Sequence, residues 1–144
     1  MKLGIAGLGW WGGTLVDAVE GSPNLKFVSA YTRSRSQQDQ DIAAKHSLKL
    51  VDSYDAMLAD PEVEGVVLGT PPPGHADQIV AAAKAGKHVF CEKPLALNKQ
   101  MADGIRHCLS GYKQVVTVGL VLRFFWEYAK LRQMVMAGDV GRVG

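Results

Sequence analysis

The chain has 144 residues, of which 47% are hydrophobic and 21% charged, and its 16 basic and 14 acidic side chains leave a net charge of +2. The length suits one domain, and the apolar, nearly balanced composition excludes a disordered polypeptide. A nucleic-acid-binding protein would usually show a strong basic excess, which this composition lacks. With two cysteines, Cys91 and Cys108, neither a disulfide framework nor a Cys-rich metal site can form, as expected in a reducing compartment.

We expect neither a membrane segment nor a secretory signal. The longest early uncharged run, residues 3–16, contains five glycines and is shorter than the about 20 residues that span a bilayer. The same run could be mistaken for the apolar part of a signal peptide, but no small-residue cleavage site follows it before Asp17. The sequence therefore predicts a cytoplasmic protein.

Short apolar runs alternate with amphipathic stretches, in the order strand 3–7, helix 10–20, strand 26–31, helix 34–46, strand 49–51, helix 54–59, strand 66–68, helix 76–85, strand 88–91, a helix capped by Asn98, strand 115–119 and helix 127–137. Ser34 and Gln37 have the spacing of a capping box. Run 66–68 shows no polar alternation, as expected of a strand buried on both faces. The prolines of 69–74 predict a rigid loop that is neither helix nor central strand.

Six strands separated by helices predict an α/β fold, with a doubly wound, mostly parallel six-stranded sheet and helices on both faces. The sequence shows no internal repeat or linker. No spacing of His, Cys, Asp or Glu indicates a metal site, and we expect none.

A glycine-rich turn joins the first strand to the first helix. Its residues are Gly7-Leu8-Gly9-Trp10-Trp11-Gly12, a G-x-G-x-x-G pattern in the strand–turn–helix context of Rossmann-type dinucleotide binding. Gly7 would permit the tight turn, Gly9 the approach of a pyrophosphate, and Gly12 close packing of the helix on the strand. Free amides at the helix start would hold the phosphates. The alternative is a strand–helix turn without a ligand.

The second strand is followed by Thr32, Arg33 and Ser34, where the adenosine ribose is expected. Sites that prefer NAD place an acid there, but no acid lies between Lys26 and Gln38. A guanidinium and hydroxyls bind a 2′-phosphate well, so the sequence favours NADP within the NAD(P) class. The alternative is that Ser34 only caps its helix and the arginine is solvated.

Further polar residues follow the fourth and fifth strands. Glu92 and Lys93 stand at a carboxyl end, where open α/β sheets bind ligands, and the Lys93–Pro94 bond is a candidate for the cis form. Lys93 could hold positive charge near a reacting oxygen, or these residues could form a surface ion pair. His75 could relay a proton, but such a residue more often caps or packs.

The aromatic run at 124–126 (Phe-Phe-Trp) follows the sixth strand. It either covers the edge of this domain or forms a surface for a partner, including a second copy.

Three segments together resemble the nucleotide-binding domain of the Gfo/Idh/MocA oxidoreductases. They are the glycine turn 7–12, the segment 69–75 (Gly-Thr-Pro-Pro-Pro-Gly-His), and the segment 85–96 that carries Glu92-Lys93-Pro94. The last is the specific Glu-Lys-Pro motif of that family. The resemblance implies residues 1–122 as the dinucleotide-binding domain and 123–144 as the start of a crossover into a substrate domain that the sequence does not contain.

The resemblance also implies roles for single residues. The turn 7–12 would hold the pyrophosphate, and the nicotinamide ribose side would be lined by Thr70, Pro71 and Pro72, with His75 beside them. Glu92 and Lys93 would reach the nicotinamide and the substrate, and Lys93 would be the catalytic residue. Arg123 would touch cofactor or substrate. The reaction would be hydride transfer between nicotinamide and an oxygen-bearing carbon of a sugar, cyclitol or related diol.

Two other functions are open to a chain with these motifs. It could be an NAD(P)-sensing regulatory module, although such a module has no chemical need for Lys93, or another kind of two-domain reductase, which the Glu-Lys-Pro context disfavours. Because the family's substrate contacts lie in a second domain, we expect dinucleotide binding with little turnover from these 144 residues alone.

Overall fold

A computed structural model describes residues 1–142, so Val143 and Gly144, the end of the predicted crossover 123–144, lie outside the described residues. The strands are β1 (Lys2–Ala6), β2 (Lys26–Tyr31), β3 (Lys49–Leu50), β4 (Gly65–Leu68), β5 (His88–Cys91) and β6 (Val116–Val118). The helices are α1 (Trp10–Val19), α2 (Gln37–Lys45), α3 (Tyr54–Ala59), α4 (His75–Lys84), α5 (Lys99–Cys108) and α6 (Trp126–Ala137), with short 3₁₀ helices η1 (Pro72–Gly74) and η2 (Val121–Phe124).

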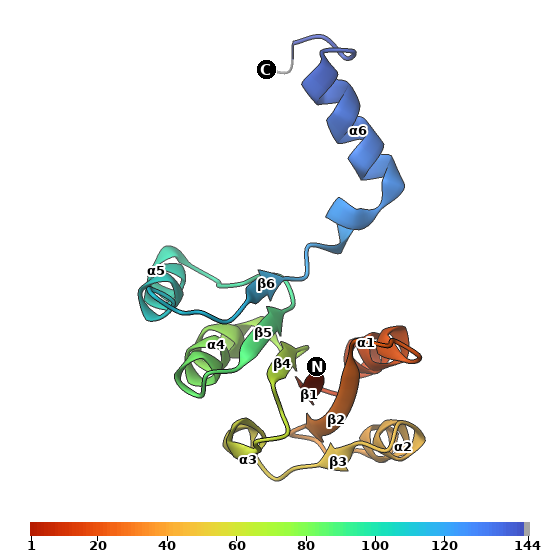
Figure 1. The fold of residues 1–144 in the computed structure, drawn as a ribbon, viewed down its shortest axis with the longest axis vertical. Helices are drawn as coiled ribbons and strands as arrows, with labels where there is room; N and C mark the ends of the chain where they lie inside the picture. Colours follow the sequence, from red (N-terminus) through yellow and green to blue (C-terminus); the bar gives the residue numbers. More distant parts are fainter. Residues whose placement is uncertain (143–144) are drawn as a thin grey trace.

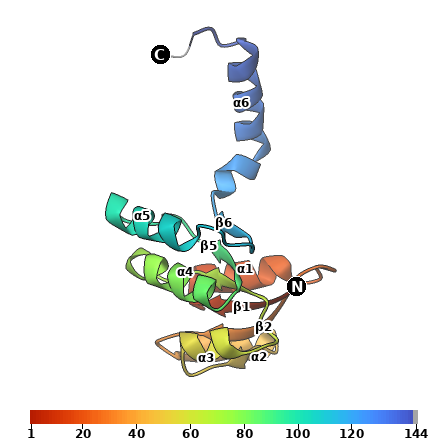
Figure 2. The same ribbon diagram turned by 60° about the vertical axis from the view of Figure 1, so that its left-hand side comes forward.

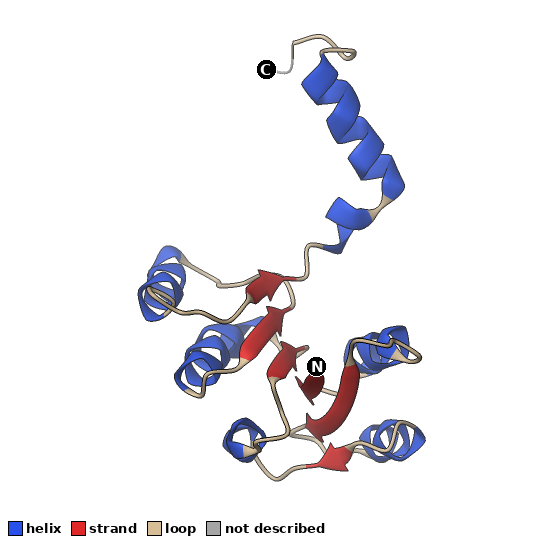
Figure 3. Ribbon diagram, in the orientation of Figure 1, coloured by secondary structure: helices blue, strands red, loops and turns tan. Residues whose placement is uncertain are grey.

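The six strands form one parallel sheet in the order β3-β2-β1-β4-β5-β6 (Figures 1 and 3). The prediction of a doubly wound α/β sheet with helices on both faces is therefore confirmed. The chain reverses its direction of growth between β1 and β4, and ligands of such sheets bind outside the carboxyl ends of the strands at this switch point.

Two apolar cores, one on each face of the sheet, hold the helices in place. Helices α1 and α2 lie on one side of the sheet, and α3, α4 and α5 lie on the other (Figure 1). Val16 of α1 and Ala43 of α2 pack with Ile5 on one face. Met57 of α3, Ile79 of α4 and residues of α5 pack with β4 and β5 on the other. All four residues of β4 are buried, as the run without alternation predicted.

One helix cap was predicted correctly and one was not. The Asn98 side chain accepts a hydrogen bond from the Met101 amide, 2.9 Å away, and begins α5. The capping box of α2 does not use Ser34 and Gln37; it is formed by Ser36 and Asp39, so the helix begins at Gln37. The carboxylate of Asp39 accepts from the Ser36 amide at 2.9 Å, a bond that fixes the start of the helix at this pair.

The proline-rich loop after β4 contains one short turn that was not predicted. Pro72–Gly74 forms the 3₁₀ helix η1, which leads directly into α4. Proline is tolerated in a first turn because the amides there need no intrahelical acceptor, so the prediction of a loop without helix was too strict.

The segment that follows β6 extends away from the sheet (Figures 1 and 2). Phe124 and Trp126 are 85% and 72% exposed, and no residue of α6 is buried. The alternative in which the aromatic run covers the edge of its own domain is therefore wrong for the described residues.

Within residues 1–142, no helix combines the length and apolar character needed to cross a bilayer.

Candidate functional site: a dinucleotide groove at the carboxyl edge

The glycine turn after β1 is held by close backbone contacts. Gly7 has φ +93°, a left-handed conformation that favours glycine, and its amide donates to the Tyr31 carbonyl at 2.7 Å. A Cβ on Gly12 would lie 1.9 Å from the Gly7 carbonyl oxygen. Only glycine at position 12 therefore lets α1 start this close to β1.

Gly9, the N-cap of α1, faces open space. A Cβ built on it meets no protein atom within 4 Å. The first intrahelical bond runs from the Gly13 amide to the Gly9 carbonyl at 2.9 Å, so the amides of the first turn have no acceptor within the helix. Free amides at the positive end of a helix, beside empty space, form an arrangement that binds a phosphate group.

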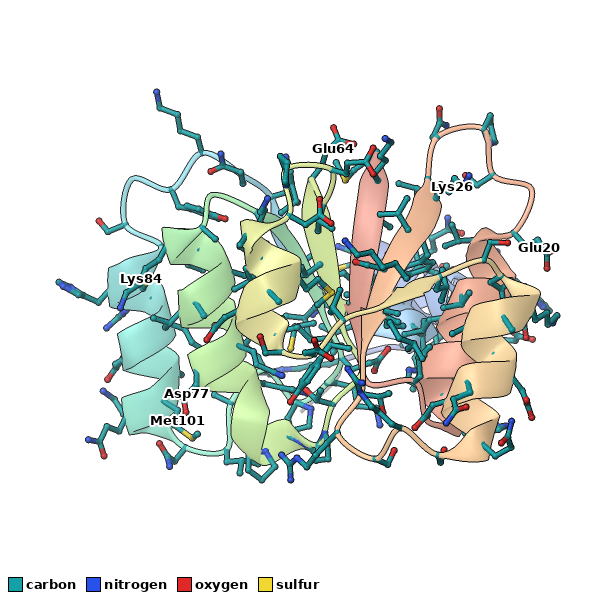
Figure 4. All side chains as sticks on the ribbon, turned by 90° about the horizontal axis from the view of Figure 1, so that it is seen from below. Glu20, Lys26, Glu64, Asp77, Lys84 and Met101 are labelled. Atoms are coloured by element: carbon teal, nitrogen blue, oxygen red, sulfur yellow. The ribbon has the colours of Figure 1, made fainter. Side chains whose placement is uncertain are left out.

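A groove of about 830 Å³ runs from this turn across the carboxyl ends of β1, β2 and β4. Figure 4 shows the two ends of the sheet: Glu20, Lys26 and Glu64 lie at the end where strands begin, and Asp77 and Met101 lie at the other end, where α4 and α5 begin. The groove is at this second end. Its lining includes these predicted residues: Gly7, Leu8, Gly9, Thr32, Arg33, Ser34, Thr70 and Pro71.

The groove also contains residues that the sequence analysis missed. They are Tyr31, Tyr54 and Gln78. The side-chain oxygen of Gln78 accepts from the Thr70 hydroxyl at 2.5 Å, and its backbone carbonyl accepts from the Tyr54 hydroxyl at 3.0 Å. Gln78 thus connects α4 to the loop after β4 and to α3. Burial raises the pKa of Tyr54, so its hydroxyl stays protonated. Tyr31 ends a predicted strand and was accessible to sequence reasoning, whereas Tyr54 and Gln78 reach the groove only by tertiary packing.

At the far end of the groove, an unpredicted acid lies behind Thr32 and Ser34. Asp39 Oδ2 accepts from the Thr32 hydroxyl at 3.0 Å and from the Ser34 hydroxyl at 2.6 Å. Burial alone would raise the pKa of Asp39, but hydrogen bonds from Ser34, Ser36 and Thr32 outweigh burial and hold the pKa below the usual value of an aspartate. The expectation that both hydroxyls donate to a 2′-phosphate is therefore wrong, because their protons are directed at Asp39.

The Glu92-Lys93-Pro94 segment follows β5, with a cis Lys93–Pro94 bond. The Glu92 side chain is 7% exposed; its Oε2 accepts from the Lys93 amide at 3.2 Å, while Oε1 is buried and has no hydrogen-bond partner in residues 1–142. The Lys93 side chain is exposed and makes no ion pair among the described residues. Glu92 therefore points into the protein and Lys93 out of it, which excludes an ion pair between them.

The His75 ring is fully buried and joins two loops of the carboxyl edge. Its Nδ1 lies 2.8 Å from the Pro94 carbonyl oxygen and its Nε2 lies 2.7 Å from the Thr70 carbonyl oxygen. Both nitrogens are thus engaged by protein atoms, and the ring does not line the groove.

Other predicted site residues also lie off the groove lining. Trp10 is exposed, and its ring stacks at a tilt on that of Trp11, 5.8 Å away. Pro72 is in η1, and Arg123 is exposed in η2, beyond β6. Gly12 packs on Gly7 rather than facing the groove.

Two further features lie away from the groove. An apolar hollow of about 390 Å³ is found near the amino ends of the strands, between α1 and β5. Asp17, Glu20 and His46 approach one another within 4.8 Å at the far end of α1, where no metal site was predicted because packing, not spacing, brings them together. Lys45 and His46 already bind Asp17, at 2.7 and 2.9 Å, and we assign no ion to this cluster.

Comparison with known proteins decides the family. The protein-family model described as "Oxidoreductase family, NAD-binding Rossmann fold" matches residues 1–120. The chain belongs to the Gfo/Idh/MocA family. An inositol 2-dehydrogenase of Rhodococcus erythropolis is 34% identical over 148 residues, which cover 99% of this chain and 42% of that protein.

Solved structures of the family agree with the fold. A putative myo-inositol dehydrogenase from Sinorhizobium meliloti is 28% identical with a TM-score of 0.86, covering 98% of this chain and 42% of that one. A putative NADPH-dependent oxidoreductase from Desulfitobacterium hafniense is 26% identical with a TM-score of 0.89, covering 100% of this chain and 42% of that one. The chain thus spans about two fifths of the relatives that it matches.

The two glycines at the start of α1 are expected to differ in how strongly a substitution by alanine destabilises the chain. Gly12→Ala places a methyl group 1.9 Å from the Gly7 carbonyl and should lower the free energy of unfolding by about 1–3 kcal/mol or more. Gly9→Ala meets no protein atom outside its own turn, so only the poorer preference of alanine for an N-cap counts, and it should lower the free energy of unfolding by less than about 1 kcal/mol. Urea unfolding of both variants measures the difference, and equal stabilities would contradict this packing.

Proposed function

We propose that this chain is the dinucleotide-binding part of an NAD(P)-dependent dehydrogenase that prefers NADP(H) and acts on a hydroxyl or carbonyl carbon of a sugar, cyclitol or related diol. The observation that carries the proposal is the open space at Gly9 in front of the unpaired first-turn amides. The residues present fit a dinucleotide, since the diphosphate has a helix start to bind and the groove continues on both sides of it.

The two ends of the groove would hold the two ends of the cofactor. Arg33 lies at the β2 end and, within the described residues, makes no ion pair, so its guanidinium is available for a 2′-phosphate. Thr70 and Pro71 line the β4 end and would contact the nicotinamide ribose. Bound there, the nicotinamide would supply hydride acceptance or donation at its C4 atom.

Lys93 would act on the substrate. It follows β5, and the Glu92 amide beside it donates to the Leu68 carbonyl at 3.0 Å, so the Lys93 and Thr70 loops leave neighbouring strands at the same level. An unpaired ammonium there would hydrogen-bond the substrate oxygen and stabilise negative charge on it as the hydroxyl passes its proton to solvent and the hydride moves to the nicotinamide. Lys93 is therefore the proposed catalytic residue.

The substrate class rests on relatives with inositol dehydrogenase names. We propose that Arg123 approaches the nicotinamide and substrate when residues 123–144 lead into further substrate-binding structure, as in longer members of the family, whereas the buried Glu92 does not. Both cysteines are free, which supports a cytoplasmic location.

Arg33→Ala is expected to weaken NADPH binding about tenfold or more while changing NADH binding less than twofold, because only NADPH carries the 2′-phosphate. Fluorescence of the reduced nicotinamide, titrated at one salt concentration, gives both dissociation constants. If the chain binds neither dinucleotide, the proposed function fails; if it binds NADH more tightly, the NADP preference fails.

In this chain joined to the remaining part of an inositol dehydrogenase relative, Lys93→Ala is expected to reduce NADP⁺-dependent oxidation of myo-inositol and related polyols at least about 100-fold, because the substrate oxygen loses its charged partner. NADPH affinity should stay within about threefold, since Lys93 does not line the groove. Absorbance of NADPH formed over long incubations at high protein concentration measures the turnover. Oxidation that survives the substitution unchanged would remove Lys93 from the catalytic role.

We also propose that the aromatic segment 124–126 mediates contact with a second copy of the chain. Three large exposed rings in sequence form an apolar surface that water disfavours. The weight-average mass from sedimentation should rise with protein concentration, and the double substitution Phe124→Ser with Trp126→Ser should keep the chain monomeric. A monomer at every concentration of the unsubstituted chain would contradict the proposal.

A further inference from the structure

Asp39 is a buried carboxylate at the β2 end of the groove to which the proposed function gives no part. The residue is 2% exposed, and its Oδ2 receives three donors: the Ser34 hydroxyl at 2.6 Å, the Ser36 amide at 2.9 Å and the Thr32 hydroxyl at 3.0 Å. The capping box of α2 requires only the Ser36 bond. The two hydroxyl bonds connect the carboxylate to residues that line the groove.

These bonds decide what the groove wall can offer a ligand. A hydroxyl has one proton to donate and lone pairs with which to accept. When Thr32 and Ser34 direct their protons at Asp39, their oxygens can act only as acceptors toward a ligand. The lowered pKa of Asp39 agrees with a carboxylate that stays charged at neutral pH.

The positive charge of Arg33 opposes the negative charge of Asp39 at this corner of the groove, which is formed by Thr32, Arg33, Ser34 and Asp39. Arg33 lines the same end of the groove and makes no ion pair in the part of the chain that the structure describes. The nearby Arg35 and Asp52 neutralise each other at 2.5 Å, so they add little net charge. The corner thus contains one buried negative charge behind two acceptors and one exposed positive charge.

We propose that Asp39 is a positioning residue for cofactor specificity, which acts through Thr32 and Ser34 to favour a ribose 2′-hydroxyl and to oppose a 2′-phosphate. A 2′-hydroxyl donates to oxygens that can only accept. A 2′-phosphate at the same place meets acceptors and a like charge, with Arg33 as its one favourable partner there. The inference rests on the proposed function, and it means that Asp39 limits the NADP(H) preference that Arg33 provides.

The experiment compares dissociation constants for NADPH and NADH in the unsubstituted chain and in Asp39→Asn. The amide is nearly the same size as the carboxylate, and its oxygen can keep accepting from Ser36, Ser34 and Thr32, so the substitution removes the buried negative charge behind the two hydroxyls. We expect the ratio of NADPH to NADH affinity to rise about tenfold. The pair 2′-phospho-ADP-ribose and ADP-ribose, which lacks the nicotinamide, should show the same change as competitors.

Asp41→Asn is the matched control, because Asp41 is an exposed acid two residues further along α2 whose side chain, within the described part of the chain, bonds only Gln37. It removes the same charge from the same helix and should change the affinity ratio less than twofold. Thermal unfolding of each variant checks that the capping box survives. If Asp39→Asn does not fold, Ser34→Ala replaces it: it keeps the carboxylate and the Ser36 cap, and NADH affinity should fall several-fold more than NADPH affinity.

The outcomes separate the two proposals. If neither dinucleotide binds the unsubstituted chain, the proposed function fails and this inference fails with it. If both bind and the ratio is the same in Asp39→Asn, or changes equally in Asp41→Asn, dinucleotide binding stands and the role of Asp39 is overturned.

Discussion

The contact between Gly12 and the Gly7 carbonyl determines the rest of the site. Because no side chain separates α1 from the turn, the helix begins directly above the end of β1, and its unpaired amides open onto the groove at Gly9. The same turn presses against the loop after β4, since a Cβ on Gly7 would lie 2.8 Å from the Gly69 carbonyl oxygen. The switch point between β1 and β4 is thus closed at its base and open above, as anion binding at a helix start requires.

Polar contacts of the buried His75 and of several half-buried side chains then connect the strand ends to one another. The His75 ring joins the loop after β4 to the one after β5, and Gln78 joins Thr70 to Tyr54 of α3. These groups are costly to bury unless each finds a partner, so their mutual bonds fix the loops relative to the sheet. The groove walls therefore derive their shape from residues that are not all on its surface.

Most helices and strands could be predicted from the sequence because hydrophobic periodicity, helix caps and turn residues are local signals. The uninterrupted apolar run of β4, the Asn98 cap and the glycine turn each carry their own signal over a few residues. The start of α2 was misplaced because Ser34 and Ser36 both suit a cap, and only the reach of the Asp39 carboxylate to the Ser36 amide decides between them. Asp39 was not predicted as an acid near the ribose because it lies seven residues beyond Thr32 in the sequence. Only the folded chain brings its carboxylate within one hydrogen bond of the Thr32 hydroxyl.

Glu92 and Lys93 show how one strand end can separate opposite charges. Successive side chains at the end of a strand point to opposite sides, so the carboxylate turns inward, where Gly119 leaves room for it, and the ammonium turns outward. A Cβ on Gly119 would lie 2.7 Å from Glu92 Oε1, so glycine at the end of β6 is what permits the inward position. Were Glu92 exposed beside Lys93, the two would neutralise each other; because Glu92 is buried, the ammonium is exposed without that partner, as its proposed role at a substrate oxygen requires.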